Sequence, residues 1–380
     1  CPQGMMSVTP FNVMGSETNE FDKDSRWWST PYTSDNDFFT GYAHVNLSGV
    51  GCPELGGLLL MPTSGDLKVD YHEYGSHYKK EVAHPGYYSN MLTKYNIKTE
   101  VTATPRTGLS RFTFPKGQGN ILLNLGEGLT NETGATVRFV SDTEIEGSKL
   151  MGTFCYNPQA VFPIYFVMQV NKAPKEKGYW KKQREMKGVE AQWDADAGKY
   201  KLYTKYTREI SGDDVGVWFK YDVAEQEQIE VKIGVSFVSI ENARENLKAE
   251  QPGFELLIHP NILQDVNGEY PKMESLEVGK TSGNRYTVFS LWDTYRNVSS
   301  LMTLLYPDRQ LDIIQTMIDM YKENGWLPKW ELYGRETFTM EGDPSIPYIV
   351  DAWMKGLRDF DTTTAYEAMR KGATTPGEFN

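Results

Sequence analysis

Residues 1 to about 238 alternate between apolar and polar positions with the period of a β-strand. In "YNIKTEVTATP", residues 95–105, every second residue is apolar or β-branched, and "QIEVKIGVSFVSI", residues 228–240, repeats the pattern. Successive side chains of a strand point to opposite faces, so this alternation predicts half-buried strands. Similar short runs follow one another with Gly, Pro, Asn or Asp between them and no helical pattern. The fold class predicted for this part is a large antiparallel β-sandwich.

The periodicity changes to that of helices after residue 238. "SIENARENLKAEQ", residues 239–251, predicts a helix with Ser239 as its N-cap. From Pro307 on, helical patterns dominate. The first is capped at Asp308, is ended by Asn324-Gly325, and has an apolar face of Leu311, Ile314, Met317, Ile318 and Tyr321.

Two more helices follow near the end of the chain. One starts after Pro344 and Pro347, and its predicted apolar face consists of Ile346, Ile349, Val350, Trp353 and Leu357. The next starts at a capping box of Thr364 and Glu367.

These patterns predict a sandwich domain at residues 1–238, a helical linker at 239–255 and a helical domain at 256–380. "LLIHPN" follows the linker almost without a connection, so we expect residues to be missing near Gly253–Glu255 and at both ends of the chain. In that case apolar helix faces such as Leu311–Ile314–Ile318 would be partly uncovered.

The acidic balance of the chain limits its partners. The 380 residues contain 39 Lys and Arg against 51 Asp and Glu, a net charge of −12. This argues against nucleic acid or an anionic membrane as the main partner. No apolar run reaches the roughly 18–20 residues that a membrane helix needs, and three cysteines imply no disulfide framework. Aromatic residues at 13% fit a sugar-binding surface or a large β-rich core.

"NGWLPKWELYGRET", residues 324–337, places aromatic rings beside charged groups. Trp330 offers a ring face and Glu331 a hydrogen-bond acceptor, a combination that suits a sugar. Arg335 and Glu336 would form a charge pair that braces the loop, while Trp326 would pack inward. The alternative is a purely structural loop.

Two other stretches carry candidate binding residues. In "FSLWDTYR", Asp293 can accept two sugar hydroxyls while Trp292 packs on a C–H face. Alternatively, Asp293 caps a helix that starts near Thr294, and Trp292 belongs to the core. "HVNLSGVGC" is a glycine-punctuated loop in which backbone amides can approach a ligand; its candidate residues are His44, Asn46, Gly49, Gly51 and Cys52. His44 has a structural alternative too.

The histidines at 72, 77 and 84 lie close together in the sequence, but their spacings do not match a zinc motif.

These stretches, together with "PQGMMSVTP", "HPGYYSNML" and "LIHPNILQDVNGEY" in the same order, resemble glycoside hydrolase family 92. The resemblance implies a bacterial, calcium-dependent, inverting exo-α-mannosidase acting on mannose-rich glycans. It implies a secreted, periplasmic or cell-surface location. The implied fold is an N-terminal β-sandwich followed by helices of an (α/α)6 barrel, which this chain would leave incomplete.

The resemblance implies that the glutamate general acid, the aspartate base and most calcium ligands lie beyond the position of Asn380. It implies mannose contacts for Trp292 and Asp293. Because sites commonly form where domains meet, we also expect "HVNLSGVGC" and "PKWELYGRET" to converge on a shared pocket. The chain departs from the family at Asn46, where a second histidine is common, and at Arg335, where Asn is common, so the linkage preference stays open. The rivals are a carbohydrate-binding protein without catalysis and a disaccharide phosphorylase with the same architecture.

Overall fold

The computed structural model describes residues 4–13, 30–47, 55–129, 134–152, 161–183, 199–204, 207–250, 260–337, 339 and 342–375. The chain forms two compact units. The first contains residues 6–256, and the second combines residues 257–380 with residues 2–5. Each unit is described by itself.

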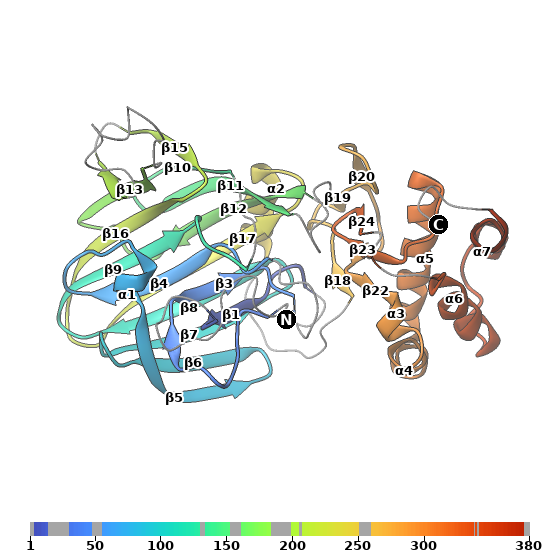
Figure 1. The fold of residues 1–380 in the computed structure, drawn as a ribbon, viewed down its shortest axis with the longest axis horizontal. Helices are drawn as coiled ribbons and strands as arrows, with labels where there is room; N and C mark the ends of the chain where they lie inside the picture. The colour runs from blue at the N-terminus through green and yellow to red at the C-terminus, as the bar shows by residue number, and fades with distance from the viewer. Residues whose placement is uncertain are drawn as a thin grey trace, which may run out of the picture. The chain divides into compact units, whose positions relative to one another are not determined.

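The first unit consists of two antiparallel sheets (Figure 1). In neighbour order, the seven-stranded sheet contains β1 (Val8–Phe11), β3 (Gly41–His44), β4 (Leu59–Ser64), β9 (Gly117–Asn124), β16 (Val215–Val223), β13 (Glu176–Lys182) and β14 (Tyr200–Tyr203). The ten-stranded sheet contains β15 (Glu209–Gly212), β10 (Ala135–Phe139), β11 (Glu144–Gly152), β12 (Val161–Val170), β17 (Glu227–Ser236), β8 (Thr107–Phe114), β7 (Ile97–Ala103), β6 (Tyr87–Leu92), β5 (Ser76–His84) and β2 (Phe38–Phe39). The predicted antiparallel sandwich is confirmed.

The period-two pattern corresponds to burial between the sheets. In β7, Ile97 and Val101 are buried while Lys98 is exposed. Across the sandwich, the ring of Phe139 in β10 lies 5.6 Å from that of Phe219 in β16, edge to face. Burial of these apolar side chains stabilises the pair of sheets.

The described part of the first unit includes the helices α1 (Tyr71–Tyr74) and α2 (Ile240–Ala249). The Ser239 side chain accepts a hydrogen bond from the backbone N–H of Asn242 at 3.1 Å, which confirms the predicted N-cap. Ala243 and Leu247 of α2 pack on Val167 of β12. The helix expected as a linker therefore covers part of the ten-stranded sheet.

The second unit combines short strands with helices. Its strands are β18 (Asn261–Ile262), β19 (Glu269–Pro271), β20 (Val278–Lys280), β21 (Tyr286–Thr287), β22 (Phe289–Ser290), β23 (Trp330–Leu332) and β24 (Arg335–Glu336). Its helices are α3 (Leu291–Thr294), α4 (Val298–Leu305), α5 (Pro307–Asn324), α6 (Ser345–Met354) and α7 (Thr362–Thr374). No helix among the described residues has the length and apolarity that crossing a bilayer requires.

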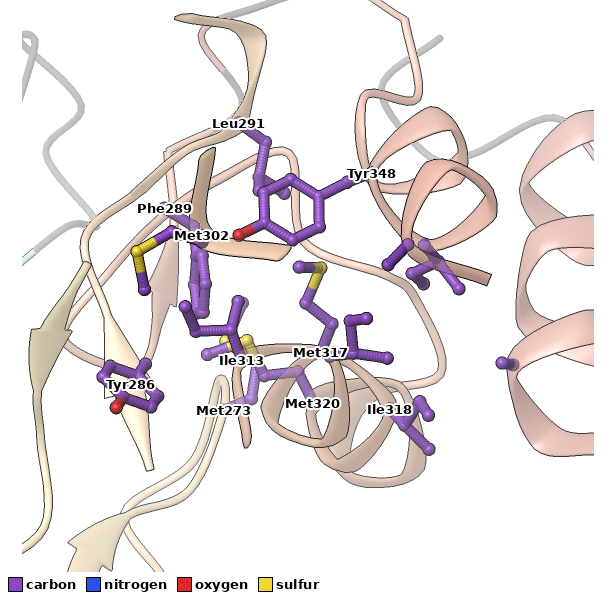
Figure 2. Close-up of a cluster of buried hydrophobic side chains, with 14 residues drawn as sticks. Met273, Tyr286, Phe289, Leu291, Met302, Ile313, Met317, Ile318, Met320 and Tyr348 are labelled. Carbon is purple, nitrogen blue, oxygen red and sulfur yellow. The ribbon is translucent and has the colours of Figure 1, made fainter. Parts of the chain in front are cut away.

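The core of the second unit surrounds α5 (Figure 2). Residues of α5 meet side chains from β21, β22, α4 and α6; the labelled members are Met273, Tyr286, Phe289, Leu291, Met302, Ile313, Met317, Ile318, Met320 and Tyr348. Ile314 and Ile318 are 0% exposed, so the expectation that Leu311–Ile314–Ile318 would be uncovered is wrong for these two residues. The short strands and neighbouring helices supply the cover.

Two predicted helix starts are wrong and one predicted end is confirmed. Helix α5 begins at Pro307 with Tyr306 at its N-cap, so Asp308 lies in the first turn, where its charge interacts favourably with the helix dipole. Asp361 caps α7 by accepting from the backbone N–H of Thr364 at 3.0 Å, and this replaces the capping box. Gly325 ends α5 with a φ of 83°.

The apolar face predicted for α6 is wrong in part. Ile349 is buried, but Val350 and Trp353 are 41% and 40% exposed. The buried side of the helix passes through Tyr348, Ile349 and Ala352 instead. Both faces carry apolar residues, so the sequence pattern did not distinguish the covered face from the open one.

Candidate functional site

Two of the stretches with candidate binding residues are neighbours in a three-stranded sheet. Strand β22 pairs with β23 so that Ser290 lies opposite Trp330 and Phe289 opposite Glu331. Helix α3 follows β22 directly and carries Trp292 and Asp293. The register of this strand pair therefore brings "SLWDTYR" beside "WELYGRET".

Trp292 and Asp293 are both exposed on the single turn of α3. The indole of Trp292 is 52% exposed, so its alternative role as a core residue is wrong. Asp293 lies within α3 and its carboxylate accepts from the hydroxyl of Ser290, so it does not cap a helix that starts at Thr294. An accessible carboxylate beside an accessible ring can receive hydroxyls and pack on C–H groups. Their contact with a sugar stays a prediction.

Glu331 is oriented into the protein. It is 0% exposed and accepts a hydrogen bond from the Thr287 hydroxyl at 2.9 Å and another from the backbone N–H of Gly334 at 2.6 Å. The hydroxyl oxygen of Thr287 accepts in turn from the backbone N–H of Tyr333 at 2.7 Å. The carboxyl group thus joins β21 to the turn after β23. This geometry gives no support to the predicted hydrogen bond between Glu331 and a sugar hydroxyl.

Burial raises the pKa of the Glu331 carboxyl to about 8. The hydrogen bonds from Gly334 and Thr287 and the positive charge of Arg285 oppose this rise in pKa, whereas the charge of Glu336 adds to it. A carboxyl with this pKa is mostly protonated at pH 7 and has one O–H to donate.

A two-residue turn connects β23 to β24. Tyr333 and Gly334 have φ values of 48° and 83°, and Leu332 pairs with Arg335 on either side of them. Positive φ at both central positions is typical of a type I′ hairpin turn, which favours glycine in one of them. A Cβ at Gly334 would also lie 3.3 Å from the backbone oxygen of Pro271.

Glu336 and Arg335 brace this hairpin, although not as a pair. The Glu336 carboxylate accepts from the backbone N–H groups of Lys329 at 2.8 Å and of Trp330 at 3.0 Å. Arg335 instead interacts with Glu274 at 3.4 Å, and Glu274 also accepts from the backbone N–H of Glu336 at 2.6 Å. The predicted Arg335–Glu336 pair is wrong because neighbouring side chains on a strand point to opposite faces.

The two tryptophans of this stretch are half-buried. The Lys371 ammonium lies 4.4 Å from the centre of the Trp326 ring, a cation–π contact that ties α7 to the loop after α5. The prediction that Trp326 packs inward is therefore correct only in part, because its ring is half-buried. Trp330 has a partly open surface in the strand next to Ser290.

A buried ion pair behind the hairpin was not foreseen from the sequence. The Arg285 guanidinium is 1% exposed, donates to Glu323 at 2.8 Å and stacks 4.5 Å from the centre of the Tyr270 ring. Glu323 also accepts from the Tyr270 hydroxyl at 2.9 Å and from the backbone N–H of Met273 at 2.8 Å. The signal was the arginine in "GNRYTVFS", a charge inside an otherwise strand-like run.

In the first unit, His44 and Asn46 are buried at 1% and 6% exposure. The His44 Nδ1–H donates to the backbone oxygen of Leu58 at 2.9 Å, and burial lowers the pKa of the ring to about 4, so it is neutral at pH 7. Asn46 donates to the backbone oxygen of Ala43 at 3.0 Å and to the hydroxyl of Ser7 at 3.2 Å. These buried contacts match the structural alternative considered for His44, and Asn46 has a structural role of the same kind.

Gly49, Gly51 and Cys52 lie outside the described residues. The convergence of their loop with "PKWELYGRET" stays a prediction.

The implied calcium was compared with the metal-binding side chains of the described residues. Among them, no group of three or more His, Cys, Asp or Glu side chains could hold a metal ion. We therefore derive no step through calcium from this chain.

Comparison with known proteins identifies solved structures with the same fold. An alpha-mannosidase of family GH92 from Bacteroides thetaiotaomicron matches with a TM-score of 0.83 and 26% identity, over 99% of this chain and 54% of its own. An inverting mannosidase of that family from B. thetaiotaomicron VPI-5482 matches with a TM-score of 0.80 and 21% identity, over 99% and 52%. The neighbours confirm the β-sandwich followed by helices.

The sequence itself matches two family models and a curated relative. The relative, an uncharacterized secreted glycosidase from Arthroderma benhamiae, is 23% identical over 90% of this chain and 46% of its own length. This chain thus spans about half the length of the relatives that it matches. Residues 1–236 match the glycosyl hydrolase family 92 N-terminal domain, and residues 251–380 match the catalytic domain of that family. The chain belongs to glycosyl hydrolase family 92.

Proposed function

We propose that the protein is an exo-acting α-mannosidase that releases terminal mannose from mannose-rich glycans with inversion of configuration. Membership of family 92 supports the reaction class. The GH92 alpha-mannosidase at 26% identity, which has also been solved with mannoimidazole, supports mannose as the sugar. The secreted glycosidase among the relatives supports an extracellular or periplasmic location.

The observation that carries the proposal is the pairing of Ser290 with Trp330. Helix α3, which carries the exposed Trp292 and Asp293, follows β22 directly and so begins next to β23, the strand of Trp330. The Asp293 carboxylate would accept two mannose hydroxyls, and Trp292 would pack on the C–H face of the ring. Such a pair recognises a terminal sugar without itself breaking the bond.

Glu331, Glu336 and Arg335 would act on the sugar indirectly. Glu331 fixes the hairpin to Thr287, and Glu336 fixes the start of β23 through the N–H of Trp330. Arg335 is held by Glu274. We propose that these three residues hold Trp330 in position and do not contact mannose themselves.

Inverting hydrolysis requires two carboxyls about 6.5–9.5 Å apart, one to protonate the leaving oxygen and one to activate water. We propose that both lie beyond the position of Asn380, together with most of the calcium ligands, and assign no catalytic group within residues 1–380. The coverage of about half of each relative supports this placement.

The test is hydrolysis by the full-length protein of an aryl α-mannoside, with an aryl β-mannoside and an aryl α-glucoside as controls. We expect turnover of the α-mannoside alone. Binding of mannose without hydrolysis of the α-mannoside would contradict the proposal and favour the rival, a carbohydrate-binding protein without catalysis. Mannose 1-phosphate formed from a mannosyl disaccharide and phosphate would favour the phosphorylase.

A further inference from the structure

Ser290 connects three parts of the candidate site. Its backbone pairs with that of Trp330 across β22 and β23. Its carbonyl oxygen accepts from the Thr294 hydroxyl at 2.9 Å, a bond that spans the single turn of α3. Its own hydroxyl donates to Oδ2 of the Asp293 carboxylate. One residue therefore contacts the strand of Trp330, the turn that carries Trp292, and the side chain of Asp293.

The Ser290 hydroxyl is not used as a helix cap. A serine at the N-cap position usually accepts from a backbone N–H two or three residues further on. Ser239 does so at the start of α2, where it accepts from Asn242 at 3.1 Å. Ser290 occupies the N-cap position of α3, but its side chain makes no capping bond. Its one hydroxyl proton goes to a carboxylate instead, so the side chain holds Asp293 rather than the helix backbone.

This bond leaves most of the Asp293 carboxylate available. The side chain is exposed, and its other oxygen, Oδ1, has no hydrogen-bond partner among the described residues. A carboxylate offers about four acceptor positions, of which the Ser290 hydroxyl takes one. Without that bond, an exposed side chain on a one-turn helix would rotate among its staggered positions. Ordering such a side chain on binding weakens affinity roughly two- to tenfold.

We propose that Ser290 is a positioning residue that presets the Asp293 carboxylate for hydroxyls of the terminal sugar. This inference rests on the proposed mannosidase function, because it requires that Asp293 contacts mannose. Ser290 acts through Asp293 and does not itself touch the sugar. Since its backbone also pairs with Trp330, the same residue fixes the carboxylate relative to the strand that carries this ring.

The alternative is a hydroxyl that only stabilises the fold of the second unit. A bond of the same kind elsewhere in that unit provides the control. The Ser300 hydroxyl donates to Asp351 at 3.1 Å and so joins α4 to α6. Ser300→Ala removes a serine hydroxyl from an aspartate, as Ser290→Ala does, but from a pair that does not include Asp293.

The experiment is a double-mutant cycle in the full-length protein, with Ser290→Ala, Asp293→Ala and both changes together. The cycle is measured as kcat/KM on an aryl α-mannoside and as the dissociation constant of mannoimidazole, a ligand with which a GH92 alpha-mannosidase of similar structure has been solved. Asp293→Ala removes the acceptor, so the Ser290 hydroxyl has no carboxylate to hold in that background. Ser290→Thr keeps a hydroxyl and tests rescue. Thermal unfolding of each variant reports whether the fold is retained.

We expect Ser290→Ala to lower kcat/KM and the affinity for mannoimidazole about fivefold, as the loss of preorganisation predicts. Ser290→Thr should restore both, and Ser300→Ala should leave both unchanged. In the Asp293→Ala background, Ser290→Ala should change either quantity by less than about twofold, because the two side chains act as one unit.

Equal losses from Ser290→Ala in both backgrounds, no loss in the wild-type background, or a loss that Ser290→Thr does not restore would each overturn the proposal. The dissociation constant needs no turnover, so the cycle can be read even if Asp293→Ala abolishes hydrolysis. A wild-type protein that hydrolyses no mannoside, yet shows the coupling in mannoimidazole binding, would overturn the mannosidase function alone. Normal hydrolysis without the coupling would overturn the role of Ser290 alone.

Discussion

Ser290 lies directly opposite Trp330 in the antiparallel pair of β22 and β23. This single register relation joins two stretches that are far apart in the sequence. It also places Trp292 and Asp293, which follow Ser290 on α3, at the end of the strand beside Trp330. The proposed recognition of the sugar by Trp292 and Asp293 depends on this relation.

Asp293→Asn in the full-length enzyme should lower kcat/KM on an aryl α-mannoside roughly ten- to a hundredfold. The change removes a charged acceptor, and a hydrogen bond to a charged group contributes about 1.5–3 kcal/mol. Asp359→Asn, at an exposed aspartate in the second unit, is the matched control and should change little. A loss below about threefold for Asp293→Asn would remove it from the mannose pocket.

Glu331→Gln should flatten the dependence of stability on pH between about 4.5 and 8. The folded protein keeps the Glu331 proton up to its raised pKa of about 8, whereas the unfolded chain loses it near the ordinary glutamate value. The folded state thus binds more protons in this window, so the free energy of unfolding falls as the pH rises. Denaturant unfolding at pH 5 and pH 8 measures the slope. Glu367→Gln, an exposed control, should leave the slope as it is; equal slopes for wild type and Glu331→Gln would refute the assigned pKa.

Arg285→Met should destabilise the second unit by about 3–5 kcal/mol, because it leaves Glu323 without the charge of its partner in a largely buried setting. The side chains of this pair are 1% and 11% exposed. Arg335→Met breaks the more exposed pair with Glu274, at 24% and 35%, and should cost less than about 1 kcal/mol. Urea unfolding of the two variants and of the wild type measures the two losses of unfolding free energy. Similar losses of stability in the two variants would show that the buried ion pair contributes no more to stability than the exposed one.

The sequence predicted these elements better than it predicted their contacts. Alternation in residues 97–103 and 229–235 identified strands because local periodicity reports which face is buried. Ser239 and Gly325 were predicted as helix ends because a cap is a local interaction. The burial of Glu331 could not be predicted in this way, since its partner Thr287 is distant in the sequence. Likewise, Asp361 caps α7 where the sequence predicted Thr364, because several neighbouring residues there are able to cap a helix.

Residues 1–380 expressed alone should release no mannose from an aryl α-mannoside with calcium present. The reason is chemical: Asp293 is assigned to hydroxyl recognition, Glu331 is buried, and inversion needs two carboxyls on opposite sides of the bond. The full-length protein is the positive control. Clear turnover by the short chain would place the catalytic pair within it and overturn the assignment.

The most direct test of the central claim follows the anomeric proton of released mannose by NMR as the full-length protein acts on an α-mannoside. The account predicts that β-mannose appears first and then mutarotates, and that Asp293→Asn slows its appearance. Absence of mannose release, or α-mannose as the first product, would contradict an inverting α-mannosidase.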